Sequence, residues 1–333
     1  MLSRVANSIY WMSRYFERAE NIARFIDVNL HLILDSPVEL DEQWEPLIKI
    51  TGDIEHFEER YGDDATKDNV IHFLTFDREN PNSIISALTN ARENARSVRE
   101  IISSEMWEQI NKSYFNLLGA EGESGRLDSP HDFYTNIKMQ SHLFIGITDT
   151  TMSHGEGWHF ARLGRLIERA DKTSRILDVK YFILLPRVED VGSPIDNIEW
   201  AALLKSASAF EMYRKKYRKI DPRKVAEFLM LDSFFPRSIH YCLMKAEESL
   251  HKITGTEPGT YRNEAERKLG RLCSELDYAN IDEIISGGLH EYLDNFQTKL
   301  NLVGDAIFDT FFALTPIVEG QHNEFNGTLK GQE

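Results

Sequence analysis

The chain has 333 residues, of which 54 are acidic and 38 basic, so its formal net charge is −16. An acidic balance spread along the chain argues against nucleic acid or an anionic membrane as the main partner. Cys242 and Cys273 are too few for a disulfide framework, and no window is apolar enough to span a membrane, so we expect a cytoplasmic protein.

Helical periodicity dominates the first half of the sequence. The first helix is predicted from Ser3 to Leu34, because apolar residues recur every three or four positions and Pro37 ends the run. A polar, weaker stretch follows over 39–63, and then a short helix near 69–76. The turn at 80–83 predicts a helix that continues through residue 102, and Ser103 or Ser104 is expected to cap another.

The second half continues the same pattern. Residues 119–130 have the composition of a flexible surface loop, and helices are predicted at 131–152 and 158–185. A connection is expected at 186–194, and the last twenty residues are polar and expected to be loose. Further helices are predicted over 197–217, 222–231, 236–254, 261–278 and 281–312.

One fifteen-residue segment occurs twice, 151 positions apart. Residues 14–28 read RYFERAENIARFIDV and residues 165–179 read RLIERADKTSRILDV. Five of the seven identical positions are charged, whereas the apolar positions differ, which is the reverse of what a duplicated helical core predicts. The identities are Arg14/Arg165, Glu17/Glu168, Arg18/Arg169, Ala19/Ala170, Arg24/Arg175, Asp27/Asp178 and Val28/Val179.

The repeat period is about half the chain, which indicates two similar halves and not a solenoid of short units. We therefore predict an all-α protein that forms a single large domain over 1–325, a bundle-like assembly of helices. Its halves, about 1–150 and 151–325, are expected to be related by a pseudo-twofold axis. Residues 326–333 are expected to form a loose tail.

The charges of the repeated segment form one polar stripe on each helix. Arg14, Glu17 and Arg24 lie within about 80° of one another on a helical wheel. The stripe is either a solvated surface or, if the two long helices meet, a centre where Glu17 and Glu168 each face an arginine of the other repeat. Such a network fixes how the halves pack or lines a ligand pocket, and the sequence leaves both readings open.

Other arginines are candidates for the same centre. Arg92 and Arg96 share a helical face on which Glu93 can pair with Arg96, a pattern also typical of a surface. Arg237 follows Pro236 at a helix start, where the helix dipole disfavours a cation unless a carboxylate or an anion is near. The candidate ligand-binding residues are Arg14, Arg18, Arg24, Arg92, Arg96, Arg165, Arg169, Arg175 and Arg237.

Metal ligands are a weaker prediction. Glu156-x-x-His159 and Glu248-x-x-His251 have the spacing that di-metal helical bundles use, with Glu17 and Glu168 as conceivable further ligands. Neighbouring arginines oppose a cation there. We therefore expect neither a metal site nor a cofactor.

Several segments together resemble one family, the bacterial alpha-E domain proteins, which are named for a helical fold with a Glu-Arg motif. They occur in family order and cover nearly the whole chain. The segments are MLSRVANSIYWMSRYFERAENIAR at the start, NPNSIISALTNARENARSVREIISSEMW at 80–107, GWHFARLGRLIERADKTSRILD at 157–178, WAALLKSASAFEMYRKKY at 200–217 and PRSIHYCL at 236–243.

The resemblance implies a link to a peptide-forming system, because such proteins are commonly associated with circularly permuted ATP-grasp ligase-like proteins and transglutaminase-like proteases. From it we expect an accessory or scaffold component that holds a peptide carboxylate in the Arg/Glu-rich centre. The motif positions that it marks, without assigned roles, are Arg14, Glu17, Arg18, Arg165, Glu168, Arg169 and the Arg92–Arg96 cluster.

Two other functions are alternatives. The first is an enzyme that acts on a peptide or amide bond, with Glu17 or Glu168 as a general base whose pKa is raised by burial and with arginines that stabilise an oxyanion. The second is a metal-dependent helical-bundle enzyme. Neither nucleic acid nor a membrane is expected as a partner, and assembly into a homo-oligomer is left open.

Overall fold

The computed structural model describes residues 1–35, 44–120, 129–183 and 194–313. Within these ranges it contains fifteen α-helices and a final π-helical turn, and no strand. The prediction of an all-α protein is therefore confirmed.

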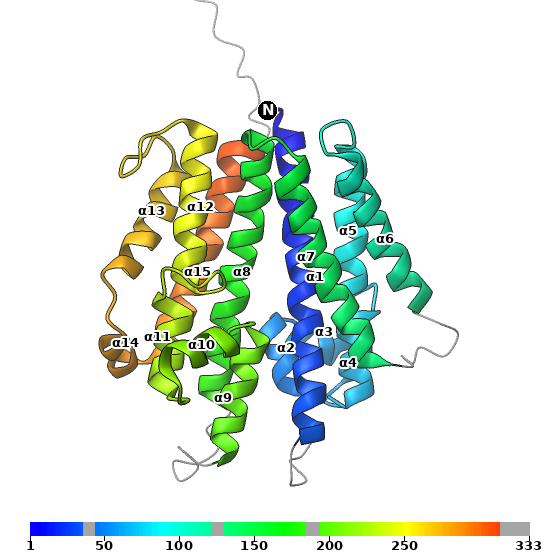
Figure 1. The fold of residues 1–333 in the computed structure, drawn as a ribbon, viewed down its shortest axis with the longest axis vertical. Coiled ribbons are helices and arrows are strands. Elements are labelled where there is room, and N and C mark those ends of the chain that lie inside the picture. Colours follow the sequence, from blue (N-terminus) through cyan, green and yellow to red (C-terminus); the bar gives the residue numbers. More distant parts are fainter. Residues whose placement is uncertain (36–43, 121–128, 184–193, 314–333) are drawn as a thin grey trace, which may run out of the picture.

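Two long helices lie side by side at the centre, each with three further long helices on its outer side (Figure 1). On one side α1 packs against α5 and α7, and α6 packs against both; on the other, α8 packs against α12 and α15, and α13 packs against both. This shared packing order is what two related halves would have, while the twofold axis stays a prediction. The helices are α1 (Ser3–Asp35), α5 (Ile84–Ser97), α6 (Ser104–Ala120), α7 (Pro130–Thr151), α8 (Glu156–Ile183), α12 (Ile239–Thr254), α13 (Glu264–Asp277) and α15 (Leu289–Ile307).

Shorter helices gather toward one end of the long ones (Figure 1). They complete the connections between the long helices, and η2 continues α15. The short α-helices are α2 (Glu45–Thr51), α3 (Ile54–Tyr61), α4 (Lys67–Thr75), α9 (Pro194–Ser206), α10 (Phe210–Tyr217), α11 (Pro222–Leu231) and α14 (Ile281–Gly287), while η2 (Phe308–Phe312) lies at the other end of α15, where Phe312 contacts Tyr10 and Phe160.

Two predicted helices are interrupted in the structure. The helix expected over 197–217 is two helices, α9 and α10, because Ser208 adopts a left-handed backbone conformation with φ of 52°. The helix expected over 281–312 breaks at Gly288, whose φ of 99° is accessible to glycine without strain. Both breaks depend on single residues and leave the helical periodicity around them intact.

Two other boundaries also differ from the sequence prediction. The helix expected to run through residue 102 ends at Ser97. The stretch over 39–63 contains α2 and α3, which are held by buried Trp44 and Phe57. The expected connection at 186–194 and the tail at 326–333 fall almost wholly outside the described residues, as do residues 121–128 of the expected loop.

The central helices approach each other closely at Gly164 of α8. A β-carbon at this position would lie 2.4 Å from the carbonyl oxygen of Tyr10 in α1. Since a backbone atom cannot move aside as a side chain can, glycine is required for this approach. The contact fixes the separation at which the charged side chains of α1 and α8 meet.

Two serines start equivalent helices and place a polar residue at the centre. The Ser83 hydroxyl accepts a hydrogen bond from the Ser86 N–H at the start of α5, and the Ser238 hydroxyl accepts one from the Tyr241 N–H at the start of α12. Each serine follows a residue that reaches the charged centre, Asn82 in the first half and Arg237 in the second.

Among the described helices, none combines the length and the apolar character needed to cross a bilayer.

Candidate functional site: an arginine–glutamate centre

The repeated charged stripes of α1 and α8 face each other inside the protein. Glu17 is 1% exposed and Glu168 is 0% exposed, so the stripe is not a solvated surface. Arg169 of α8 binds Glu17, and Arg14 and Arg18 of α1 bind Glu168. Each glutamate thus faces arginines of the other repeat, as one of the two sequence hypotheses predicted.

One group of these side chains, which we call the closed cluster, comprises Glu17, Glu20, Asn21, Arg24, Arg169 and Arg237. Arg169 binds Glu17 through two parallel hydrogen bonds, from Nε to Oε1 and from Nη2 to Oε2, each 2.8 Å long. Arg237 donates to Glu17 Oε1 at 3.2 Å and also to Glu20, which Arg24 contacts as well. Each carboxylate of the closed cluster is therefore engaged by two arginines.

Arg237 lies just before the capped start of α12, a place that the helix dipole makes unfavourable for a cation. Its contacts with Glu17 and Glu20 supply the carboxylates that the sequence argument required. Of the two partners that the sequence argument allowed, a carboxylate or an anion, the structure shows carboxylates.

The second group, which we call the open cluster, comprises Glu168, Asp171, Arg14, Arg18, Lys172 and Arg175. Arg14 donates from Nε to Glu168 at 2.9 Å, and Arg18 donates from Nε at 2.7 Å and from Nη2 at 3.1 Å. Arg175 donates from Nε to Asp171 at 3.0 Å, and Lys172 Nζ lies 3.2 Å from the same carboxylate. Arg14 and Arg18 thus share the carboxylate of Glu168, and Lys172 and Arg175 share that of Asp171.

A cavity of about 530 Å³ lies beside the open cluster. It is lined by all four cations of that cluster, by Asp171 and Asp305, and by aromatic rings including Trp11 and Phe308. The Arg14 guanidinium lies over the Trp11 ring at 4.6 Å from its centroid, which holds the arginine in place by a cation–π contact. Neither Glu17 nor Arg237 of the closed cluster lines this cavity.

Gly52, which follows α2, makes room for a cation at the cavity. Its φ is 82°, and a β-carbon there would lie 3.1 Å from Nη1 of Arg175. The guanidinium therefore extends along bare backbone where any larger residue would crowd it. Among the described residues, the hydrogen bonds of Arg175 leave from Nε alone, to Asp171.

The arginines keep both central glutamates ionised. Burial raises the pKa of Glu168, but the attraction of Arg18 and Arg14 outweighs it and the pKa falls well below the usual range. Burial likewise raises the pKa of Glu17, and Arg169 and Arg237 lower it by more. The expectation that burial would raise the pKa of a general base is therefore wrong for both residues, because two arginines contact each one.

Arg165, the repeat counterpart of Arg14, binds neither Glu17 nor Glu168. Its Nε is buried and makes no hydrogen bond within the described part of the chain. Burial and the neighbouring Arg169 lower its pKa to about 10. The second arginine that contacts Glu17 is instead Arg237, which donates to Oε1.

Two predicted ligand-binding residues, Arg92 and Arg96, lie outside the centre. Arg96 is exposed and pairs with Glu93 at 2.6 Å, which is the surface pairing that the sequence pattern allowed. Arg92 donates to Asn111 at 2.8 Å and lies over the Tyr114 ring. The structure does not bring either arginine to the clusters or the cavity.

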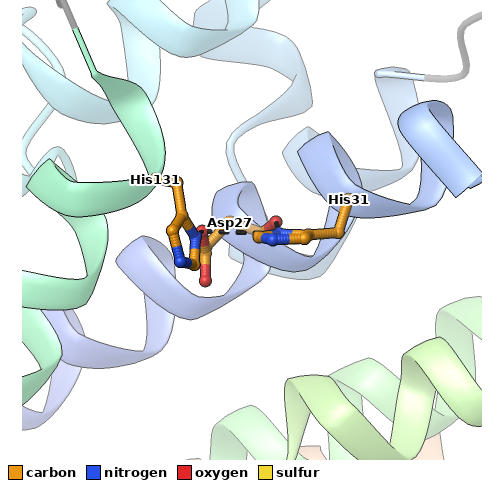
Figure 2. Close-up of side chains that lie close together, drawn as sticks. All are labelled: Asp27, His31 and His131. Atoms are coloured by element: carbon orange, nitrogen blue, oxygen red, sulfur yellow. Dashed lines mark hydrogen bonds and ion pairs between the residues drawn. The ribbon is translucent and has the colours of Figure 1, made fainter.

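The Glu-x-x-His motifs do not converge on a metal site. Glu156 binds the N-terminal amino group, and Glu248 pairs with Lys245 and Arg162. In the described ranges, the group of His, Cys, Asp and Glu side chains close enough to hold a metal ion is Asp27, His31 and His131 (Figure 2).

Sequence reasoning missed several residues that belong to these sites. Lys172 occupies the position in the second repeat that Asn21 occupies in the first. The sequence alone could therefore have shown that the polar stripe of the second helix contains an additional cation. No sequence pattern indicated the 2.9 Å contact of Asn82 with Arg18, because 64 positions separate the two residues. His31 lies one turn after Asp27, but its approach to His131 depends on the packing of α1 against α7.

The fold and the site define a class, an all-helical domain whose centre is built from buried Glu-Arg pairs. A family model described as a predicted alpha-helical domain with a conserved ER motif matches residues 1–312. The chain therefore belongs to the alpha-E family. Glu17–Arg18 and Glu168–Arg169, the two Glu-Arg dipeptides of the repeat, both lie at the centre.

Curated relatives come from mycobacteria. A protein of Mycobacterium bovis and proteins of two strains of Mycobacterium tuberculosis, each named as uncharacterized, are 24% identical to this chain over 339 residues. The alignments cover 93% of this chain and 37% of each relative, so the chain spans little more than a third of their length. No solved structure matches the chain significantly.

Proposed function

We propose that this protein binds the carboxylate end of a peptide in the cavity beside the open cluster. In this proposal it serves as an accessory component of an ATP-grasp-linked system for peptide synthesis or modification. The observation that carries the proposal is the cavity of about 530 Å³ lined by four cationic side chains. The partners expected from the family, a circularly permuted ATP-grasp ligase-like protein and a transglutaminase-like protease, belong to the same proposal.

The charge balance at the cavity favours an anion. Arg14 and Arg18 share the single carboxylate of Glu168, and Lys172 and Arg175 share that of Asp171. An entering anion adds negative charge where cations are in excess and partly desolvated, so its attraction is stronger than at an exposed surface.

The chemistry of the lining favours a carboxylate joined to a peptide. A guanidinium matches the planar carboxylate with two parallel donors, and the Arg175 Nη atoms are the donors placed for it. Asp305 supplies an acceptor for an amide or ammonium N–H, while Trp11 and Phe308 supply apolar surface for a side chain. The volume falls within the range of small-molecule sites.

The enzymatic alternative receives less support from this geometry. A general base needs a pKa near the working pH, and the pKa values of Glu17 and Glu168 are lowered instead. Their oxygens are also occupied by arginine donors. The metal-dependent alternative named two Glu-x-x-His motifs, and these do not converge.

Calorimetric titration with tri-alanine and with tri-alanine amide tests the binding site, because the two probes differ only in the terminal carboxylate. We expect the free acid to bind at least tenfold more tightly than the amide. Arg175→Gln should weaken binding of the acid about tenfold, since it removes one charge and two donors. Arg96→Gln is the matched control and should leave binding unchanged.

Equal binding of acid and amide, or an Arg175→Gln variant that binds as well as the wild type, would overturn the site. The accessory role needs a separate experiment. The ATP-grasp ligase-like protein is expected to co-purify with this chain and to change its turnover when the chain is added. If the two neither associate nor influence each other, the accessory role is wrong whatever the titration gives.

A further inference from the structure

A second group of side chains lies at the contact of α1 with the start of α7, apart from the cavity. Asp27 is 4% exposed, and its Oδ1 lies 2.7 Å from Nδ1 of His131. His31, one turn further along α1, has its Nδ1 3.7 Å from the same oxygen. Figure 2 shows the two imidazole rings on either side of Asp27, coming from different helices, and His31 Nδ1 lies 2.8 Å from the Asp27 backbone carbonyl oxygen.

We propose that Asp27, His31 and His131 bind a transition-metal ion of the zinc class. One ligand atom from each residue lies within 4.8 Å of the other two. Two imidazoles and one carboxylate form a ligand set typical of zinc sites that keep a fourth position open for water or a substrate. Imidazole ligands select such ions over magnesium and calcium, which prefer oxygen.

The freedom of the ligands allows the group to close around an ion. Zinc bonds to nitrogen and oxygen are about 2.0 to 2.2 Å long, so in a tetrahedral site the ligand atoms lie about 3.3 to 3.6 Å apart. Asp27 Oδ1 and His131 Nδ1, now 2.7 Å apart, must therefore separate slightly, while the His31 ring must move toward them. The His31 and His131 side chains are 43% and 56% exposed, so they can rotate toward the ion and be reached from solvent. Asp27 is held in place and provides the fixed point.

Lys138 both supports and limits this site. Its Nζ lies 2.5 Å from Oδ2 of Asp27, so it orients the carboxylate and leaves Oδ1 for the ion. Outer partners of this kind are typical of ligating carboxylates. The lysine charge also repels a cation, and we therefore expect affinity in the micromolar range and not that of a structural zinc site.

The other half of the chain contains an incomplete version of the same arrangement. Asp178, the repeat counterpart of Asp27, lies 2.6 Å from Nδ1 of His290 on α15. The position that corresponds to His31 is residue 182, which is phenylalanine. Since the described residues provide two such ligands here and three at Asp27, this pair is an internal control that should not bind zinc tightly.

Zinc titration of the full-length, tag-free protein against a chromophoric chelator tests the proposal. We expect one equivalent of Zn²⁺ to bind, and we expect His31→Gln and His131→Gln each to weaken it at least tenfold. His290→Gln should leave the affinity unchanged. Circular dichroism of each variant establishes that the fold is retained.

Cobalt gives a second readout that does not depend on affinity. Co²⁺ in a site with few ligands absorbs visible light strongly, and this band should be lost in His131→Gln and kept in His290→Gln. The proposal is wrong if the wild type binds zinc no better than the His31 and His131 variants, or if the cobalt spectrum is that of the free hydrated ion.

Discussion

The closed and open clusters arise from one repeated segment, yet their surroundings differ. Glu17 in the closed cluster is held by Arg169 and Arg237, and its neighbour Glu20 is held by arginines as well. Glu168 in the open cluster is held by Arg14 and Arg18 beside a cavity. The same Glu-Arg motif thus serves packing in one place and lines an opening in the other.

Two pairs of corresponding positions account for much of this difference. The residue before the capping serine is Arg237 in the second half, and it contacts Glu17 of the closed cluster. In the first half this residue is Asn82, which contacts Arg18 of the open cluster. Within the stripe, Asn21 of α1 corresponds to Lys172 of α8. The open cluster, which Asn82 contacts, thus has the cavity and the extra cation Lys172, and it is the cluster at which we propose the binding site.

The largest expected effect is on the closed cluster. Glu17→Gln should lower the free energy of unfolding by about 3–5 kcal/mol, because it leaves Arg169 and Arg237 buried without a matching charge. Glu168→Gln should cost less, about 1–3 kcal/mol, because Arg14 and Arg18 can be solvated from the cavity. Urea denaturation measures both.

Glu264→Gln, which alters an exposed pair with Arg267, is the control and should be neutral. Equal losses for Glu17→Gln and Glu168→Gln would mean that the two clusters do not differ energetically.

Acid should reveal the same buried carboxylates. The pKa values of Glu17 and Glu168 are lower in the folded protein than the ordinary value of about 4.3, so their stabilisation is complete above that value and is lost as the pH falls below it. The free energy of unfolding should therefore fall between about pH 5 and pH 3, with up to about 1.4 kcal/mol per pH unit from each carboxylate. Urea denaturation midpoints measured between pH 5 and pH 3 test this prediction. A Glu17→Gln protein that loses as much stability in acid as the wild type would contradict it.

An exchange between repeats tests the open cluster. Lys172→Asn, which gives α8 the residue of α1, should weaken tri-alanine binding about tenfold, or about 1.4 kcal/mol, by removing a cation from the cavity. The unfolding free energy should change less than it does in Glu17→Gln. Unaltered binding would show that Lys172 does not act on the ligand.

The smallest effect is expected at Arg165. Because its Nε is buried without a partner, Arg165→Met should change the unfolding free energy by no more than about 1 kcal/mol, in either direction. Arg14→Met removes hydrogen bonds to Glu168 and should cost more. Thermal unfolding of the two variants compares them, and a large loss in Arg165→Met would show that this arginine has a structural role.

Much of the fold was readable from sequence because long helices carry strong periodicity. The limits of α1 and α8 were predicted within about two residues, and α11 was predicted as it occurs. The breaks at Ser208 and Gly288 were missed because one residue with positive φ interrupts a helix without changing the apolar pattern around it.

The candidate site was readable only in part. The repeat identified Glu17 and Glu168 together with Arg14, Arg18 and Arg169, because the charged positions are identical while the apolar ones differ. Arg237, which also faces Glu17, lies outside the repeat and was a candidate because of its place at a helix start. The separate place of Arg92 depends on how α5 packs against α6, and the pairing of Arg18 with Asn82 depends on how α1 packs against the start of α5. No local sequence pattern encodes either contact. The lowered pKa values were also unreadable, because they follow from the number of arginines at each carboxylate.

The sequence separation of the central ion pairs delays their formation during protein synthesis. Arg14 and Glu168 are 154 positions apart, so at about 5–20 residues per second a ribosome completes Glu168 on the order of ten seconds or more after Arg14. Until then Arg14 and Glu17 lack their partners on α8, although Arg24 can already pair with Glu20 within α1, and the helix cannot pack against α8. The first half is therefore expected to remain incompletely packed until α8 is made, and damage to α8 should appear as poor yield of the whole chain and not as a stable half.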